Sequence, residues 1–154
     1  MKTKLTFIIA LVFTTLLISS SCEKIEEKIE EKLTPQLSAD LNGTNWETKS
    51  VFALKSDSGF SITAAEDSTM IILFIKEFKN GKYHISDTSF LATYTTDKEV
   101  TNIHVGLSGE IEIIESEDHG ANFDIKFNFM SISTLTGDTV YVTNGKGKNI
   151  INPI

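Results

Sequence analysis

The chain has 154 residues, of which 40% are hydrophobic, and its 14 basic and 21 acidic residues give a net charge of −7. Every basic residue is a lysine, and an acidic chain without arginine is poorly suited to phosphate backbones and base edges, so we expect no nucleic-acid partner. With a single cysteine the chain can form no internal disulfide, so a folded domain must depend on its apolar core.

The first stretch of the chain has the organisation of a secretory signal peptide. Lys2 and Lys4 are followed by fourteen uncharged residues, 5–18, and then by three serines that lead directly to Cys22. This order is typical of an export signal, and the apolar part is too short for a membrane-spanning helix, which needs about 20 residues. The position of the cysteine predicts a lipoprotein signal over residues 1–21, with Cys22 as the acylated first residue. Ordinary cleavage after the serines is the alternative.

Lipidation at Cys22 predicts attachment to a membrane through the lipid alone. Each buried methylene contributes about 0.8 kcal/mol and one acyl chain anchors only weakly, so we expect two or three chains. Loss of the signal removes Lys2 and Lys4, and the net charge of the remaining 133 residues becomes −9. We therefore expect a cell outer-membrane location, either periplasmic or surface-exposed.

Residues 22–36 are predicted to form a short, partly helical tether. Ile25, Ile29 and Leu33 recur at every fourth position with glutamates and lysines between them. Charged pairs at that spacing contribute about 0.2–0.5 kcal/mol each, but a helix this short is marginal in water. Pro35 ends the pattern, because the residue before a proline avoids helical angles. We expect a solvated spacer and not a coiled coil, which needs sustained heptads.

From residue 37 onward the hydrophobic period changes to two, which predicts one all-β domain over residues 37–154. Turn-forming dipeptides such as Asn42-Gly43 and Asn80-Gly81 separate the alternating segments. About ten short strands result, with no helical pattern of 10–15 residues between them. We therefore expect an antiparallel β-sandwich or a flattened barrel.

Three segments bear most directly on the core. Alternation with smaller or polar residues predicts that Trp46, Phe52 and Leu54 share the apolar face of their strands. Residues 70–75 are apolar at every position, which predicts a central strand or one that curls through the core. Residues 123–129 show the cleanest alternation of apolar with polar side chains, which predicts a strand buried on one face.

The densest group of polar side chains lies in residues 110–119. Carboxylates and an imidazole could bind Ca²⁺ or Zn²⁺. However, two of the glutamates alternate with isoleucines, as on a solvated strand face, and residues 117–120 are typical of a hairpin turn. We therefore expect no metal site and no cofactor here. The group consists of Glu110, Glu112, Glu115, Glu117, Asp118 and His119.

The sequence lacks a recognisable catalytic constellation. His84, His104 and His119 lie in separate segments, and none is paired with a nucleophile. Residues 106–109 fall one residue short of a nucleophile elbow, and residues 145–148 lack the length and the hydroxyl of a phosphate loop, so both are predicted to be turns. We expect that the protein is not an enzyme.

Several short motifs resemble those of small all-β lipoproteins of unknown function from Bacteroidota. The resemblance covers most of residues 40–151 and implies an all-β fold and a lipid anchor, but no activity. The acidic run after Cys22 also resembles the surface-export signal of such lipoproteins, which implies display on the outer leaflet. The motifs are Asn42-Gly43-Thr44-Asn45-Trp46, Gly81-Lys82-Tyr83, Gly109-Glu110-Ile111-Glu112-Ile113, Phe127-Asn128-Phe129 and Thr143-Asn144-Gly145.

Two functions stay open on the sequence alone. The first is a lipid-anchored binding or structural module of the cell envelope, with an envelope protein or a glycan as its partner. The second is a lipocalin-like carrier of a small apolar ligand, which needs an apolar cavity of about 300 Å³ or more. Nothing in the sequence indicates an oligomeric state.

Overall fold

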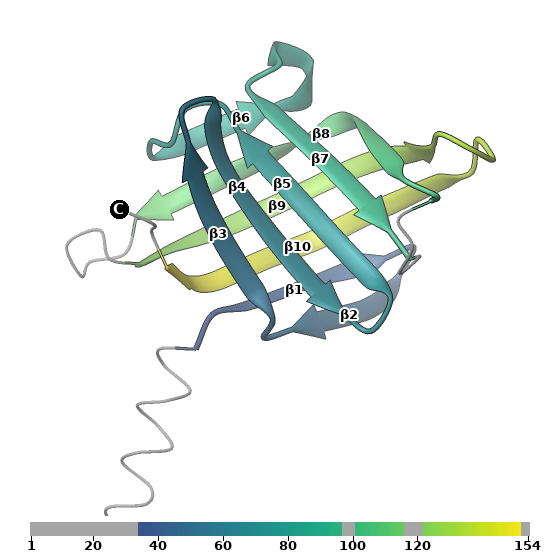
Figure 1. Cartoon of the computed structure of the whole chain (residues 1–154), viewed down its shortest axis with the longest axis horizontal. Helices are drawn as coiled ribbons and strands as arrows, with labels where there is room; N and C mark the ends of the chain where they lie inside the picture. Colours follow the sequence, from purple (N-terminus) through teal and green to yellow (C-terminus); the bar gives the residue numbers. More distant parts are fainter. Residues whose placement is uncertain (1–33, 97–100, 116–121, 152–154) are drawn as a thin grey trace, which may run out of the picture. The chain divides into compact units, whose positions relative to one another are not determined.

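A computed structural model of the chain describes residues 34–96, 101–115 and 122–151 (Figure 1). Pro35–Ile154 forms one compact unit. The predicted signal peptide, Cys22 and most of the predicted tether lie outside the described residues, so these assignments stay predictions.

The described residues form ten strands, and every pairing between neighbours is antiparallel, which confirms the predicted all-β fold. The strands follow the order β2-β1-β10-β9-β8-β7-β5-β4-β3, and β6 pairs with β8. Among these residues no helix is long and apolar enough to cross a membrane. The elements are β1 (Gln36–Leu41), β2 (Thr44–Thr48), β3 (Val51–Ser56), β4 (Gly59–Glu66), β5 (Thr69–Ile75), β6 (Gly81–His84), the short 3-10 helix η1 (Ile85–Asp87), β7 (Phe90–Thr95), β8 (His104–Glu115), β9 (Asn122–Ser133) and β10 (Thr139–Ile151).

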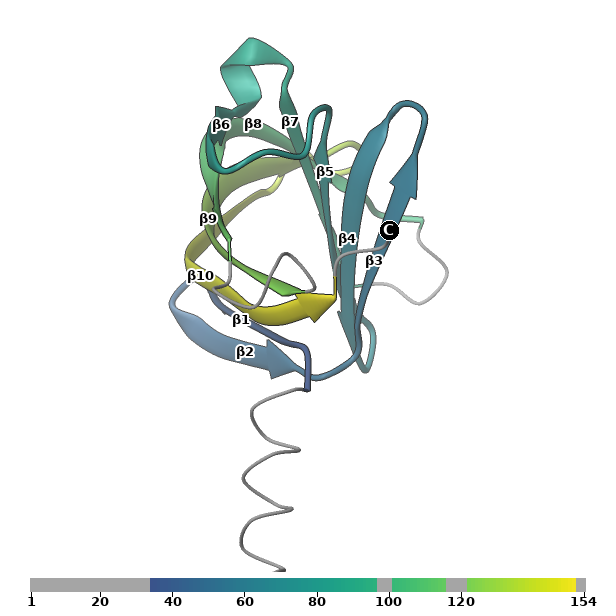
Figure 2. The ribbon, with the colours of Figure 1, turned by 90° about the vertical axis from the view of Figure 1, so that its left-hand side faces the viewer.

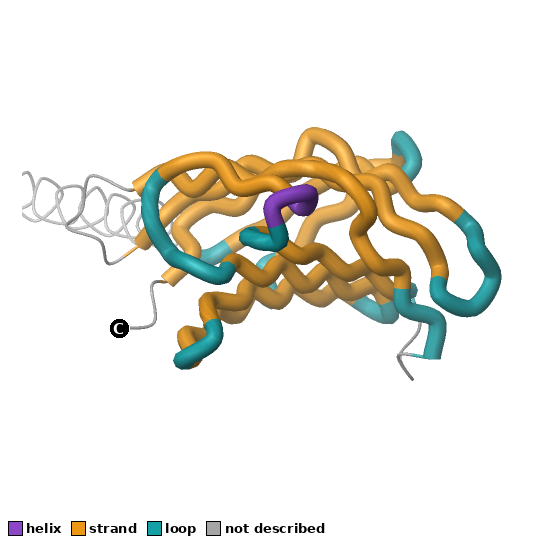
Figure 3. The backbone as a smooth tube through the Cα atoms, turned by 90° about the horizontal axis from the view of Figure 1, so that it is seen from above, coloured by secondary structure: helices purple, strands orange, loops and turns teal. Residues whose placement is uncertain are grey.

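The sheet curls because its two end strands are neighbours in the chain. β2 ends at Thr48 and β3 begins at Val51, yet these strands stand at opposite ends of the strand order. The sheet therefore folds over into two layers (Figure 3), with β3, β4, β5 and β7 in one and the remaining strands in the other (Figure 2). The result is a flattened, nearly closed barrel.

Thr48 fastens the two layers together at this junction. Its side chain is 4% exposed, and its hydroxyl oxygen lies 2.7 Å from the carbonyl oxygen of Ala65 and 2.8 Å from Oε2 of Glu66. The same oxygen accepts a 2.9 Å hydrogen bond from the backbone N–H of Ser50. Since Ala65 and Glu66 belong to β4, these bonds link the end of β2 to the opposite layer.

Apolar side chains from both layers fill the space between them. The predicted alternation of residues 123–129 is confirmed, because its four apolar side chains are buried. Phe60 from β4 and Phe123 from β9 meet with ring centroids 5.4 Å apart, and Phe78 packs against both rings at 4.6 and 4.8 Å. Offset and edge-on ring pairs of this kind add to the stability that burial alone provides.

Two segments that the sequence predicts to be turns lie inside strands. Residues 106–109 belong to β8 and residues 145–148 to β10, and both regions contain register shifts typical of β-bulges. A bulge inserts an extra residue and uses the same glycine and asparagine chemistry as a turn, so the two look alike in a sequence. A Cβ atom on Gly145 would lie 2.5 Å from the carbonyl oxygen of Phe127, so this bulge requires glycine. The predicted turn at residues 106–109 is therefore wrong, and β8 runs through it as one strand.

Candidate functional site

The strand β3 presents its large apolar side chains to solvent. Phe52 is 63% exposed and Leu54 is 67% exposed, whereas Val51 and Ala53 pack against the core. The prediction that Phe52 and Leu54 share the apolar face of Trp46 is therefore wrong. Residues 51–54 are apolar in both alternating sets, so the sequence alone does not show which set is buried. Pairing with β4 determines this, because Ala53 lies opposite the fully buried Ile62.

These two side chains begin two apolar rows across the outer side of one layer. Ile72 and Phe74 of β5 lie in the same rows and are half-buried, while Leu91 of β7 is 50% exposed. The first row reaches from β3 across this layer to the start of β8, which is about 19 Å at the usual strand spacing, and the second row ends on β7. We call the six apolar residues of these rows the apolar face. In register, the first row is Phe52, Thr63, Ile72, Thr93 and Val105, and the second is Leu54, Ser61, Phe74 and Leu91.

The apolar face carries no charge. Between its apolar members the two rows contain only the hydroxyl residues Ser61, Thr63 and Thr93. The largest apolar patch on a typical monomer often has a functional role. In the sequence, residues 70–75 were the signal for this face. A strand that is apolar on both sides packs one side against the core and leaves a second apolar side facing outward. The prediction that this strand is central is confirmed, because β5 lies between β4 and β7.

The strands of the other layer carry exposed charged side chains, among them acidic residues singled out from the sequence, and they also expose Leu107, Ile114 and Tyr141. Glu110 and Glu112 point outward from β8, while Ile111 and Ile113 are buried, as the alternation predicts. Glu112 stands in register between Lys82 of β6 and Lys126 of β9, so its two cross-strand neighbours are cations.

Glu110 has a different pair of neighbours. It stands between His84 and Asn128, and Nδ1 of His84 lies 3.8 Å from its Oε2. Within the described residues, no three side chains of the metal-binding types cluster. Glu117, Asp118, His119 and the side chain of Glu115 lie outside the described part. The expectation that residues 110–119 bind no metal stays a prediction.

His104 is the one buried histidine among the described residues. It is 6% exposed, its ring meets that of Tyr94 edge-on at 5.4 Å, and its Nδ1 has no hydrogen-bond partner. Ser133 lies opposite it on β9. The Ser133 hydroxyl donates to Oδ1 of Asn102 at 2.6 Å and accepts from the backbone N–H groups of Leu135 and Thr136. It shapes the turn after β9, and no hydrogen bond joins it to His104.

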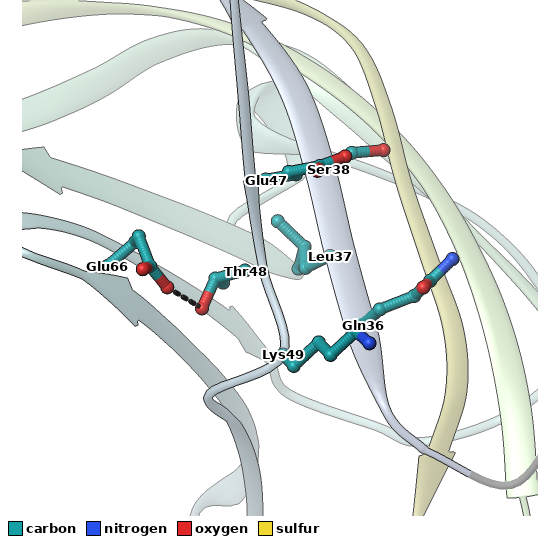
Figure 4. Close-up of a pocket in the computed structure, with 7 residues that line it drawn as sticks. All are labelled: Gln36, Leu37, Ser38, Glu47, Thr48, Lys49 and Glu66. Carbon is teal, nitrogen blue, oxygen red and sulfur yellow. Dashed lines mark hydrogen bonds between the residues drawn. The ribbon is translucent and has the colours of Figure 1, made fainter. Parts of the chain in front are cut away.

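A hollow of about 360 Å³ lies beside the junction of the two layers (Figure 4). It is large enough for a small ligand, but six of its seven lining residues are polar or charged. The exception is Leu37, which is 1% exposed. This chemistry does not match an apolar ligand. The lining residues are Gln36, Leu37, Ser38, Glu47, Thr48, Lys49 and Glu66.

Fold and surface together define an all-β domain, a flattened barrel whose β3, β4, β5 and β7 layer has an uncharged, largely apolar outer face. The chain belongs to the DUF6252 family, since residues 33–150 match the model of this domain of unknown function. No curated protein and no solved structure matches the chain. The family covers nearly the whole β domain and assigns it no activity.

Proposed function

We propose that this chain is a lipid-anchored lipoprotein of the cell envelope whose β domain serves as a binding or structural module and not as an enzyme. The order of charge, apolar stretch and serines before Cys22 supports the anchor. The resemblance to Bacteroidota lipoproteins supports an outer-membrane location. The signal and Cys22 lie outside the described residues.

The apolar face is the observation that carries the binding role. Leaving Phe52 and Leu54 more than half exposed forgoes part of the stabilisation that burial would bring, about 1.5–3 kcal/mol for each large apolar side chain. An uncharged patch that spans several neighbouring strands is a surface at which a partner would be desolvated at low cost. We propose an envelope protein as the partner at this face.

The interior gives less support to a carrier of apolar ligands. Its largest fully buried side chains include Phe60, Phe90 and Phe123, which come from both layers and occupy the space where a ligand would bind. The hollow at the layer junction is polar. Large buried side chains in the interior and an apolar exterior fit a binding module better than a carrier.

The anchor is tested by metabolic labelling with radioactive palmitate. We expect the full chain to be labelled and to sediment with membranes, and we expect Cys22→Ser to be unlabelled. An unlabelled wild-type chain that is secreted freely would reject the anchor.

The binding role is tested by chemical cross-linking of the full chain in native membranes. Leu54→Ser should remove a cross-linked product, whereas Leu135→Ser should keep it. Leu135 is a matched control because it is 72% exposed but lies in the turn after β9, outside the apolar face. Equal products from the two variants would reject the apolar face as the binding site.

A further inference from the structure

Two hollows lie next to each other on the layer that contains β8, β9 and β10. The first has a volume of about 310 Å³ and lies between β6, η1, β8 and β9, and the second has a volume of about 280 Å³ and lies over β8, β9 and β10. Glu110 and Asn128 line both hollows, so the two form one trough across the strands. We call it the polar trough. It shares no residue with the apolar face and does not depend on the partner proposed there.

Two β-bulges, one in β8 and one in β10, border the polar trough on either side of β9. A Cβ atom on Gly109 would collide with the carbonyl oxygen of Asn128, and one on Gly145 would lie 2.5 Å from the carbonyl oxygen of Phe127. Because both positions exclude a side chain, the surface of the sheet is hollow here. Bulges are frequent next to active sites, where they re-aim side chains.

The bulge in β10 brings Asn144 to the border of the trough. Its φ angle of 53° lies in the left-handed region, which asparagine tolerates. Its Nδ2 donates a hydrogen bond to Oδ2 of Asp40 at 2.7 Å. This bond holds the amide group in place and leaves its oxygen as an acceptor.

The trough presents hydrogen-bonding groups that have few partners within the protein. Glu110 and Glu112 are half-buried, and Asn128 is exposed. Among the described residues, the side chains of Glu112 and Asn128 form no hydrogen bond and no ion pair, and Glu110 has only the ring of His84 at 3.8 Å. A ligand in the trough would therefore find carboxylate acceptors and an amide that can both donate and accept.

Two lysines face each other at one end of the trough. Lys126 of β9 stands directly opposite Lys146 of β10, and both are exposed. Like charges in this arrangement destabilise a sheet. In the part of the chain that the structure describes, neither ammonium group forms an ion pair. Beyond the pair, Lys146 has the neutral Ser38 as its neighbour on β1. An anionic group bound between the two ammonium groups would offset their repulsion.

We propose that the polar trough binds an acidic glycan, a chain of sugar rings that carries carboxylate groups. A sugar carboxylate binds between Lys126 and Lys146, and sugar hydroxyl groups donate hydrogen bonds to Glu110 and Glu112. The exposed side chain of Leu107, at the other end of the trough, offers an apolar contact to the C–H groups of a ring.

The mixture of charges selects this class of ligand. A polyanion without donors, such as a phosphate backbone, would meet the two glutamates without a hydrogen atom to share with them. A neutral sugar would leave the repulsion between the lysines in place. The net charge of −7 has little effect at the trough, because exposed charges more than about 8 Å apart are largely screened at physiological ionic strength.

The ligand class is tested with the full chain in a detergent that contains no sugar. The probes are immobilised oligosaccharides of glucuronic, galacturonic and mannuronic acid, together with the neutral forms made from each by reduction of its carboxyl groups. We expect at least one acidic oligosaccharide to bind, and its neutral form to bind about tenfold more weakly. Failure of all the acidic oligosaccharides to bind, or equal binding of the acidic and neutral forms, would overturn the proposal.

The site is tested by titration calorimetry with the acidic oligosaccharide that binds. Lys126→Gln and Lys146→Gln should each raise the Kd about two- to tenfold. Neither substitution should lower the midpoint of urea unfolding, because each relieves the repulsion between the two ammonium groups. Lys55→Gln is the matched control, since it removes the same charge from an exposed lysine of β3, in the other layer, and it should leave the Kd unchanged. If Lys55→Gln weakens binding as much as Lys126→Gln does, attraction by charge alone explains the binding and the trough is not the site.

Discussion

Replacement of Thr48 by valine tests whether the hydrogen bonds of its hydroxyl group hold the two layers of the barrel together. Valine has the same shape but lacks the hydroxyl, so the contacts to Ala65 and Glu66 and the bond from Ser50 are lost together. Hydrogen bonds of this kind contribute about 0.5–1.5 kcal/mol each, and a partner left unsatisfied costs about 1–3 kcal/mol. Because Ser50 and Glu66 are exposed and water can replace part of the loss, we expect Thr48→Val to lower the free energy of unfolding by about 1–3 kcal/mol.

The assay is urea unfolding followed by far-ultraviolet circular dichroism. Thr48→Ser keeps the hydroxyl and should retain most of the stability. Thr139→Val is the matched control, since Thr139 is an exposed threonine at the start of β10. For a domain of this size the expected change also lowers Tm by several degrees. If Thr48→Val is no less stable than Thr139→Val, these hydrogen bonds do not hold the layers together and the explanation of closure is wrong.

Three further substitutions test the interior. His104→Phe should match or exceed the wild type in urea unfolding, because it removes a buried nitrogen without a partner and keeps the edge-on ring contact; a clear loss would reveal a bond that His104 makes. Burial raises the pKa of Tyr94 above 10.0, so its contribution to stability is complete below that pH and falls as the pH rises through the raised value. Tyr94→Phe should therefore flatten the alkaline limb of the stability curve, whereas the exposed Tyr141→Phe should not. Phe127→Asp buries a charge in the core and should abolish the cooperative melt; a variant that melts cooperatively would mean that this face is not buried.

Much of the fold could be predicted from the difference in polarity between neighbouring side chains. Residues 123–129 alternate strongly between apolar and polar, so burying the polar set would cost free energy and only one orientation is possible. The same holds for the isoleucines of β8 between Glu110 and Glu112. Where apolar and polar side chains alternate strongly, the predicted buried faces are confirmed.

The candidate site could not be predicted for the opposite reason. Val51, Phe52, Ala53 and Leu54 are all apolar, so alternation within β3 carries no preference for a face. Exposure there is set by pairing with β4, a contact that local sequence does not encode. The bulges of β8 and β10 were missed because glycine and asparagine serve turns and bulges equally well. Both kinds of error arise where non-local pairing decides the local structure.

The pairing of β1 with β10 has a consequence for how the domain folds. Gln36 lies opposite Lys148, so the first strand of the domain has its neighbours in β2 and in the last strand of the chain. Contacts between such distant segments give a high contact order, which slows folding. The N-terminal hairpin can find its place only after the last strand has been synthesised, so the barrel should close late and nearly all at once.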